Sequence, residues 1–597
     1  MRRFAYAAAG LLVLPALLWL SLGRAEEKSV NPAPRKVDNF TLKDTDGKEW
    51  SLDALSKTKA VVVVFIGIEC PVSNAYLPAL NELHKKYADK DVQFLAVNSN
   101  ALDTPAKIVG HAKEYKVAFP VLKDTANVVA DKFGARRTPE AFVLSPAGAV
   151  LYQGRIDDQF GIGYKREGPT RRDLAAALDE VLAGKTVSTA KTDVAGCLIA
   201  RAIKPKETGT VTYAKQVARI LQNNCQECHR PGQVGPMPLL TYDDAVAWSG
   251  MIKEVVTEKR MPPWYADPAH GKFSNDRRLS KEDYDNLLAW IDQGCPKGDP
   301  ADLSKPKEFA EGWRIGKPDV VFTMEKEYTV PSKVEKKSIK YQNFLVQTNF
   351  DEDRWVQAAE CRPGNRAVVH HIIVYAFAGT FQDIERERRP DPIGTGFLAA
   401  YAPGDMPLIC PDGAAKKVPK GATLVFQMHY TPTGTEEKDR SSVGLIFAKQ
   451  PPKYEVKTRA IAQRKFEVPA GDDNYLVTSQ ATFDRDAELL SMLPHMHLRG
   501  KDFKYDVVFP DGKKETLLSV PKYDFGWQSN YRLASPLKLP KGTRIECTAH
   551  FDNSAKNPNN PDPKSSVKWG EQTWEEMMIG FVDYVYLAEP GKKTGEK

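Results

Sequence analysis

The sequence predicts a multi-domain protein with one layered α/β domain, one all-α domain and two all-β sandwiches. Three observations carry this expectation. Strand and helix patterns alternate through the first third, a helical segment with a loop-rich middle follows, and short alternating apolar runs separated by turn residues fill the rest. The chain has 597 residues, too many for one core, because domains usually contain about 100–200 residues.

The first 25 residues have the pattern of an export signal. Arg2 and Arg3 precede an uncharged, mostly apolar run, and the small residues Gly23 and Ala25 suit cleavage before Glu26. We expect residues 1–25 to be a signal peptide or an uncleaved membrane anchor. In both cases the rest of the chain lies outside the cytoplasm, in the periplasm or an equivalent compartment. The net charge of +7 forms no basic block, so we expect no nucleic-acid partner.

The α/β domain is expected at residues 33–190. Its signature is the continuous β-branched run at 61–68, which is typical of a strand buried on both faces. Further strands are expected at 92–98, 119–122 and 141–144, and helices at 73–87, 107–115 and 174–182.

The remaining boundaries follow from changes in composition. Residues 205–298 form the all-α domain, whose last helix at 281–293 has apolar residues at helical spacing, and the Pro- and Lys-rich residues 299–317 form a linker. The two sandwiches are expected at 318–450 and 453–590, with strands at 368–375, 423–429, 503–509, 543–550 and 578–586. The Asn- and Pro-rich residues 553–566 predict a surface loop.

The segment from Cys225 to His229 is a CxxCH motif. Its two thiols can form thioethers to a haem, and His229 can supply an axial imidazole. A dithiol pair or half of a zinc site are the alternatives. We expect one covalent haem c with Met261 as its second axial ligand; Met237 and His270 are the rivals. The segment resembles class I cytochromes c, in which a Met-Pro follows the CxxCH and an apolar helix ends the domain.

Five of the ten histidines gather in three clusters within the β region: His370 with His371, then His429, then His495 with His497. Alternate strand residues share a face, so the HxH pair can bind one ion. The adjacent His370 and His371 would point in opposite directions on a regular strand, so joint binding requires a bulge or a change of ring nitrogen. Imidazole suits copper, and a thioether favours its reduced state.

The stretches PGNRAVVHHIIVYAF, LVFQMHYTP, LPHMHLRGKDF and WEEMMIGFVDY resemble successive segments of ascorbate-dependent type II copper monooxygenases, the family of peptidylglycine hydroxylating monooxygenase and dopamine β-monooxygenase. The resemblance implies two jelly-roll-like copper domains. It implies an electron-transfer copper on His370, His371 and His429. It also implies an oxygen-binding copper on the catalytic residues His495, His497 and Met577. Met577 is preferred to Met578 because it directly follows the acidic residue.

The sequence departs from that family at the substrate site. Peptide-amidating members bind a peptide carboxylate with an Arg, an Asn and a Tyr, and the matching positions here are Leu493, Ile579 and Phe581. A C-terminal peptide is therefore not the expected substrate. Cys547 lies in a segment resembling one with a family disulfide, but Met578 occupies the partner position; Cys361 with Cys410 is another possible pair.

Cys70 follows the buried strand and begins a helix, where the helix dipole lowers a thiol pKa. Thr138-Pro139 resembles the proline that faces the thiol in thioredoxin folds, and the domain resembles the redoxin group that includes alkyl hydroperoxide reductase. Ser73 replaces the second Cys of a CxxC motif, and the peroxidatic PxxxTxxC pattern is absent. Cys197 is either a distant resolving thiol for a redox-active, catalytic Cys70 or its partner in a structural disulfide.

The leading hypothesis is an exported copper monooxygenase that hydroxylates a C–H bond of an unidentified small organic molecule with O2. Two coppers and one haem c are its expected cofactors. An ascorbate-like reductant or a redox protein is the expected electron donor, with electrons passing through the haem to the copper on His370, His371 and His429. The alternatives are a non-enzymatic haem and copper electron carrier and a thiol–disulfide oxidoreductase.

Overall fold

The computed structural model describes residues 35–587, apart from 167, 311, 333–338, 380–381, 383–395 and 405. The signal peptide or anchor expected at residues 1–25 lies outside this range. Among the described residues, every helix is too short or too polar to cross a membrane.

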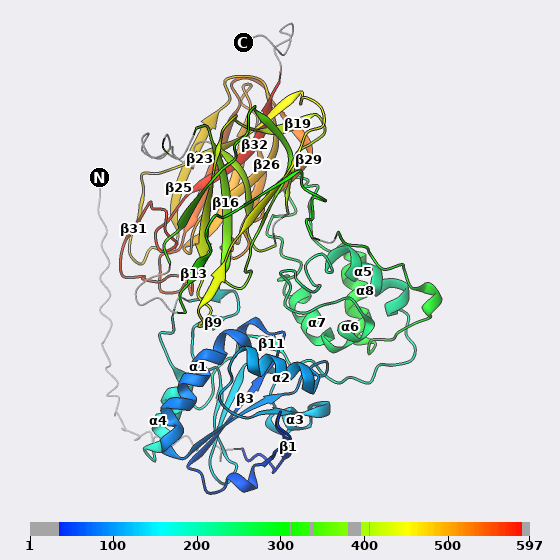
Figure 1. Cartoon of the computed structure of the whole chain (residues 1–597), viewed down its shortest axis with the longest axis vertical. Helices are drawn as coiled ribbons and strands as arrows, with labels where there is room; N and C mark the ends of the chain where they lie inside the picture. The colour runs from blue at the N-terminus through cyan, green and yellow to red at the C-terminus, as the bar shows by residue number, and fades with distance from the viewer. Residues whose placement is uncertain are drawn as a thin grey trace, which may run out of the picture. The chain divides into compact units, whose positions relative to one another are not determined.

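The N-terminal part is an α/β domain around a five-stranded sheet (Figure 1). Its strand order is β5 (Val121–Lys123), β4 (Val92–Asn98), β3 (Ala60–Ile66), β7 (Glu140–Leu144) and β8 (Val150–Gly154). The central strand β3 is parallel to β4 and antiparallel to β7, and all of its residues are buried. Apolar side chains from both faces of β3 enter two separate clusters, as its β-branched sequence predicts. The helices are α1 (Pro71–Tyr87), α2 (Pro105–Glu114), α3 (Val128–Phe133) and α4 (Asp173–Leu182).

Short strands complete this domain. They are β1 (Thr41–Lys43) with β2 (Glu49–Ser51), β9 (Phe160–Gly161) with β10 (Tyr164–Lys165), and β6 (Arg137–Thr138) with β11 (Cys197–Leu198). The last pair differs from expectation, because β11 lies beyond residue 190 and still pairs with this domain. A strand of two residues has no periodicity, so the sequence pattern gave no sign of it.

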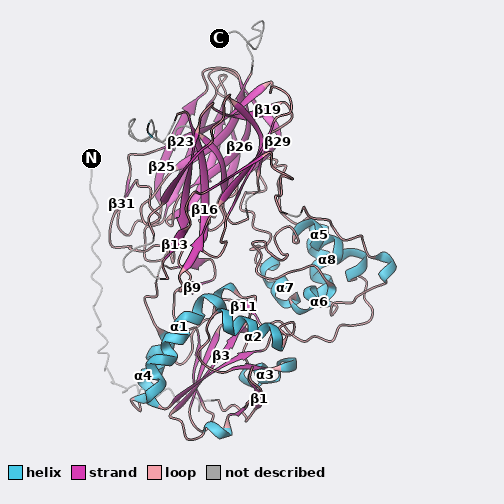
Figure 2. Ribbon diagram, viewed as in Figure 1, coloured by secondary structure: helices cyan, strands magenta, loops and turns pink. Residues whose placement is uncertain are grey.

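The next part is helical between residues 213 and 292 (Figure 2). It contains a π-helical turn (Tyr213–Val217) followed by α5 (Ala218–Asn224), α6 (Tyr242–Ala247), α7 (Ser249–Thr257) and α8 (Lys281–Asp292). Leu287 and Trp290 of α8 are fully buried, which agrees with the expected apolar face. The stretch after α8 differs from a free linker: Gln222 donates to the carbonyl of Lys305 at 3.2 Å, and the Arg230 guanidinium lies 4.2 Å from the ring centroid of Phe309.

The C-terminal part consists of β-strands. Its first half contains β12 (Val320–Thr323), β13 (Tyr328–Val330), β14 (Gln342–Gln347), β15 (Arg354–Arg362), β16 (Val369–Phe377), β17 (Phe397–Tyr401), β18 (Leu408–Ile409), β19 (Ala414–Val418), β20 (Thr423–Tyr430), β21 (Glu437–Asp439) and β22 (Ser442–Phe447). Its second half contains β23 (Tyr454–Ala462), β24 (Glu467–Val468), β25 (Tyr475–Thr482), β26 (Ala487–His495), β27 (Gly500–Val508), β28 (Lys514–Val520), β29 (Tyr531–Leu539), β30 (Arg544–Phe551), β31 (Val567–Lys568) and β32 (Ile579–Tyr586). Residues 553–566 contain no strand or helix, as their composition predicts.

The two halves share one sheet. A nine-stranded sheet runs β12-β22-β15-β19-β23-β32-β26-β29 with β18 attached to β15, and β19 joins the halves by pairing in parallel with β23. Each half also has its own four-stranded sheet, β14-β20-β16-β17 in the first and β25-β30-β27-β28 in the second. Two independent sandwiches were expected, but the pairing of β19 with β23 removes an open sheet edge from each half.

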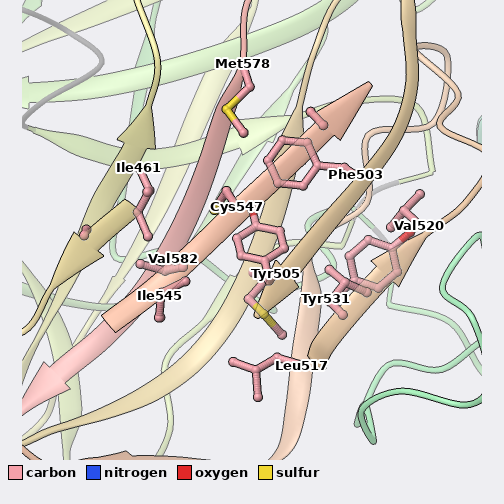
Figure 3. Close-up of a cluster of buried hydrophobic side chains, with 14 of the residues drawn as sticks. Ile461, Phe503, Tyr505, Leu517, Val520, Tyr531, Ile545, Cys547, Met578 and Val582 are labelled. Atoms are coloured by element: carbon pink, nitrogen blue, oxygen red, sulfur yellow. The ribbon is translucent and has the colours of Figure 1, made fainter. Parts of the chain in front are cut away.

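The core of the second half contains Tyr505, Cys547 and Met578, which Figure 3 shows together. All three side chains are fully buried, so Met578 belongs to the core. The possible Cys361–Cys410 disulfide is wrong, because the register places Cys410 beside Gln357, four residues along β15 from Cys361. Four strand residues span about 13 Å, beyond the reach of a disulfide.

Candidate functional site

Cys70 lies at the N-terminus of α1, directly after the buried strand β3. Its side chain caps the helix by accepting a hydrogen bond from the backbone N–H of Ser73 at 3.4 Å. The Ser73 hydroxyl accepts a hydrogen bond from the N–H of Gly67. Ser73 is thus part of the turn that positions Cys70.

Cys197 reaches Cys70 from 127 residues further along the chain. β11 pairs Cys197 with Thr138, and the N–H of Cys197 lies 3.5 Å from the Cys70 sulfur. The thiol of Cys70 donates to the carbonyl of Thr138 at 2.9 Å. Cys70 is fully buried, and Cys197 is only 7% exposed. The two sulfur-bearing residues therefore meet beside Thr138-Pro139, at the position the sequence assigned to the thiol.

A polar network holds the segment after Cys197 in place. The side chain of Asn100 accepts from the N–H of Ala200 at 2.9 Å and donates to Asp103 at 3.1 Å. The N–H of Ala101 donates to the carbonyl of Ala200 at 3.0 Å. Cys197 therefore pairs with Thr138, and Asn100 holds Ala200, three residues further along the same segment.

The two thiols have opposite pKa shifts. Burial opposes ionisation of Cys70, but hydrogen bonds from the Cys197 side chain and from the N–H groups of Cys197 and Ser73 outweigh it and lower the Cys70 pKa. The hydrogen bond to Cys70 and burial raise the pKa of Cys197 far above the usual thiol range. This asymmetry favours a Cys70 thiolate that accepts a hydrogen bond from a Cys197 thiol.

The first histidine set converges in the first half of the β part. His370, His371 and His429 each place a ring nitrogen within 4.8 Å of the others. His371 and His429 are direct neighbours on β16 and β20, and the register shifts between Val369 and His371. This shift is the bulge that adjacent histidines need in order to face the same ion.

The nitrogens of this set have the chemistry of metal ligands. His370 Nδ1, His371 Nε2 and His429 Nδ1 are buried without hydrogen-bond partners in the described part of the chain. The other nitrogen of His429 lies 3.3 Å from the Thr573 hydroxyl, an outer-shell contact of the kind that fixes a ligating ring. Burial lowers the pKa of His370 to about 4 and lowers those of His371 and His429 further. These shifts favour the neutral imidazoles that metal binding requires. A buried ring nitrogen without a partner is otherwise costly.

The second histidine set lies in the second half of the β part. The ring centroids of His495 and His497 are 5.2 Å apart. Nδ1 of His495 bonds the side chain of Gln528 at 2.6 Å, and Nδ1 of His497 bonds the carbonyl of Glu575 at 3.1 Å. Both rings thereby keep Nε2 for a metal, and His497 Nε2 is buried without a partner among the described residues.

A cavity connects the two sets. His371, His495 and Met577 all line it, whereas Met578 lies in the core. The Phe525 ring lies between the sets, stacked on His370 at 4.9 Å and 5.9 Å from His497. The structure therefore brings every expected copper ligand to one region, and the donor types fit copper.

The CxxCH residues follow α5. Nδ1 of His229 lies 3.0 Å from the carbonyl of Met237, so this nitrogen carries the proton and Nε2 is the one left for iron. Burial raises the pKa of Cys225 to about 12 and also raises that of Cys228. These residues fit a covalent haem. Met237, a rival axial ligand, is buried and orients His229 through its backbone; Met261 is half-buried and precedes Pro262.

Several positioning residues carried no signal in the sequence. Gln528, Phe525 and Thr573 lie in loops, far in sequence from the histidines they contact. Glu576 is fully buried and accepts hydrogen bonds from the N–H groups of His497 and Arg499. Only the contact geometry identifies these four residues.

Comparison with known proteins identifies the N-terminal part. Residues 33–153 match the AhpC/TSA family. The thiol-disulfide oxidoreductase ResA of Bacillus thuringiensis (strain Al Hakam) is 28% identical over 145 residues, which cover 24% of this chain and 82% of the relative. The ResA of Bacillus subtilis (strain 168) is 34% identical over 115 residues, covering 19% and 62%.

Among solved structures, a hypothetical protein, SMc02350, from Sinorhizobium meliloti 1021 shares 32% identity, with a TM-score of 0.26 and coverage of 28% of this chain and 93% of that protein. The family match shows an AhpC/TSA-type thioredoxin-like domain at residues 33–153; a helical segment and a large β part follow it. The matched residues end before the CxxCH and the histidine sets, so the assignment of those sites depends on the chemistry of their own residues.

Proposed function

We propose that the N-terminal domain is a thiol–disulfide oxidoreductase in which Cys70 is the nucleophile and Cys197 the resolving thiol. The observation that carries this proposal is the hydrogen-bonded Cys70–Cys197 pair at the N-terminus of α1. The similarity to ResA proteins supports it. The thiol–disulfide function was an alternative hypothesis from the sequence, and it has more support than the copper monooxygenase hypothesis.

The reaction is an exchange of two sulfur–sulfur bonds. The Cys70 thiolate attacks one sulfur of a substrate disulfide, and the other substrate sulfur leaves as a thiolate that takes up a proton. Cys197 then loses its proton and attacks the Cys70 sulfur, which releases the second substrate thiol. The substrate gains two electrons and two protons, and the protein keeps a Cys70–Cys197 disulfide that an external dithiol reduces again.

Oxidised glutathione is a suitable probe for this chemistry. The reduced full chain should form the Cys70–Cys197 disulfide, detected by peptide mass mapping. Cys197→Ser should stop at a glutathione adduct on Cys70, and Cys70→Ser should leave Cys197 unmodified. Cys547→Ser, which changes a fully buried core cysteine, is the control and should behave like the parent.

A pair that exchanges only after unfolding would mean that the disulfide is structural. Because Cys70 is completely buried, a reagent reaches its sulfur only after a local opening, and exchange in the folded chain should be limited by that opening.

The histidine sets support a second function, a copper-dependent monooxygenase in the β part. The single observation behind it is the convergence of His370, His371 and His429. Copper on His495, His497 and Met577 would supply O2 activation and C–H hydroxylation, as the resemblance implies. The protein holds the imidazoles neutral and fixes their rings through Gln528 and Thr573.

Copper analysis tests this second function. The full chain should bind two copper ions, and the His495→Ala/His497→Ala double variant should bind one and lose reductant-dependent O2 consumption. His84→Ala changes a histidine packed against Phe94 and Phe119 and should keep both ions. Two ions in the double variant, or none in the parent, would contradict the assignment.

We also propose that Cys225, Cys228 and His229 hold one covalent haem, which would carry single electrons toward the copper on His370, His371 and His429. The donor would be an ascorbate-like reductant or a redox protein outside the cytoplasm. Haem absorbance should survive acid–acetone extraction. On mixing reduced protein with O2, haem oxidation should be slower in His429→Ala than in the parent, and equal rates would refute the relay.

A further inference from the structure

The cavity between the histidine sets has an apolar wall at the positions where the resembling family has polar groups. Leu493, Ile579 and Phe581 all line it. The wall continues through the ring of Phe397, whose centroid is 5.7 Å from that of Phe581. The Phe581 ring is in turn 6.4 Å from the ring of His495, so the apolar surface reaches the proposed metal ligands.

Positive charge is absent from the described lining of this cavity, and Glu571 is its one charged residue. Arg366 donates to the hydroxyl of Tyr401, a lining residue, at 3.4 Å, and two other nearby cations bind groups outside the cavity. Lys416 Nζ lies behind the Phe397 ring, 5.0 Å from its centroid, and binds Thr458 at 2.7 Å and Asp583 at 3.4 Å. Arg532 donates to the backbone carbonyls of residues 406 and 407. In the copper-free protein an anion would lose its hydration here and gain no cationic partner from the lining, which is strongly unfavourable.

Two uncharged polar side chains of the described lining, besides the histidines, form no hydrogen bond with a described residue: Gln427, and Tyr341, whose hydroxyl is buried without a partner. Gln427 is 9% exposed and lines the cavity, and its side-chain amide forms no hydrogen bond with any described residue. The neighbouring Gln528 amide is occupied by His495. An amide offers both a donor and an acceptor, so Gln427 can bind one hydroxyl or carbonyl of a ligand. The cavity volume is about 60 Å³, space for roughly four water molecules, so a ligand of about four non-hydrogen atoms fits.

We propose that this cavity binds a small, uncharged, largely apolar molecule with a hydroxyl or carbonyl group, held against Leu493, Ile579 and Phe581. That the ligand is the substrate rests on the proposed copper monooxygenase function, whereas its binding depends only on the cavity. The lining offers an acidic ligand no cationic side chain, and Gln427 or Tyr341 binds the polar group of the ligand.

Three probes of about four non-hydrogen atoms test the proposal: 1-propanol, acetate and propylamine. Binding to the full chain is measured by calorimetry, with and without copper. Without copper, 1-propanol should bind at least tenfold more tightly than acetate or propylamine. Leu493→Arg places a cation in the cavity and should raise acetate affinity at least tenfold while weakening 1-propanol. Leu476→Arg, at a position on β25 that is 54% exposed, is the matched control and should bind all three probes like the parent.

A second variant covers the case in which Leu493→Arg fails to fold. Phe581→Leu should weaken 1-propanol severalfold without improving acetate, and Gln427→Leu should reduce the preference for 1-propanol over 1-chloropropane. Equal binding of acetate and 1-propanol to the copper-free parent would overturn the proposal. Copper content is measured separately: a chain that binds 1-propanol selectively but no copper refutes the copper function and supports the cavity assignment. A chain that binds two coppers but does not prefer 1-propanol supports the copper function and refutes the cavity assignment.

Discussion

Gly196 sets the position of Cys197, so replacing it tests the thiol pair without removing either sulfur. A Cβ atom at Gly196 would lie 2.1 Å from the carbonyl oxygen of Thr138, and the Gly196 φ of +126° is one that other residues rarely adopt. Carbon–oxygen contacts normally lie near about 3.3 Å, so Gly196→Ala must move β11 by about 1 Å. The backbone conformation adds a cost of about 1–3 kcal/mol.

This shift separates the two sulfur-bearing residues, because Cys197 directly follows Gly196 and pairs with Thr138. A disulfide tolerates Cβ separations of only about 3.5–4.5 Å, so the displacement strains the oxidised form. We expect the equilibrium constant for oxidation by glutathione to fall at least tenfold, which corresponds to about 1.4 kcal/mol and about 30 mV. Acid-quenched mass mapping of protein in glutathione buffers measures it.

Gly184→Ala is the matched control in the same domain. Gly184 also has a positive φ, +68°, but nothing lies within 4 Å of its added Cβ. It should cost about 1 kcal/mol of stability and leave the glutathione equilibrium unchanged. The reasoning is wrong if Gly196→Ala folds and keeps the parent equilibrium, because Cys197 would then not depend on the close approach to Thr138.

Three further predictions concern single side chains. Cys197→Ala removes the hydrogen bond that lowers the Cys70 pKa. Because only the thiolate reacts, the pH at which Cys70 reacts half-maximally with iodoacetamide should rise, and a downward shift would contradict this cause. Lys416→Met leaves the carboxylate of Asp583 without its cation. Urea unfolding should show a loss of about 3 kcal/mol in the free energy of unfolding, whereas an unchanged midpoint would mean that the pair contributes nothing. His429→Ala should reduce copper from two ions to one by metal analysis, and retention of both would remove this residue from the ligand set.

The fold of the N-terminal domain followed closely from its sequence. The buried run at 61–68 became β3, and the expected helix at 73–87 became α1, because continuous β-branched residues and helical periodicity are strong local signals. The strand that delivers Cys197 had no such signal. It has two residues, and its position depends on Thr138 and on the hydrogen bond from Ala200 to Asn100, which are tertiary contacts.

The histidine sets were predicted in part. The spacing of His495 and His497 and the need for a bulge at His370 could be read from strand geometry. The residues that hold the rings, such as Gln528 and Phe525, lie in irregular loops whose partners only the fold defines. The parallel pairing of β19 with β23 was equally hidden, since a sequence pattern gives strands but not their neighbours across a domain boundary.

That pairing decides how this protein can be divided in the laboratory. A fragment ending before residue 451 would leave β19 without its partner, and a fragment beginning there would leave β23 with an open parallel edge. Exposed edges of this kind template intermolecular pairing, so each half made alone should self-associate. Coexpression of the two halves should restore solubility, because each would supply the strand that the other lacks.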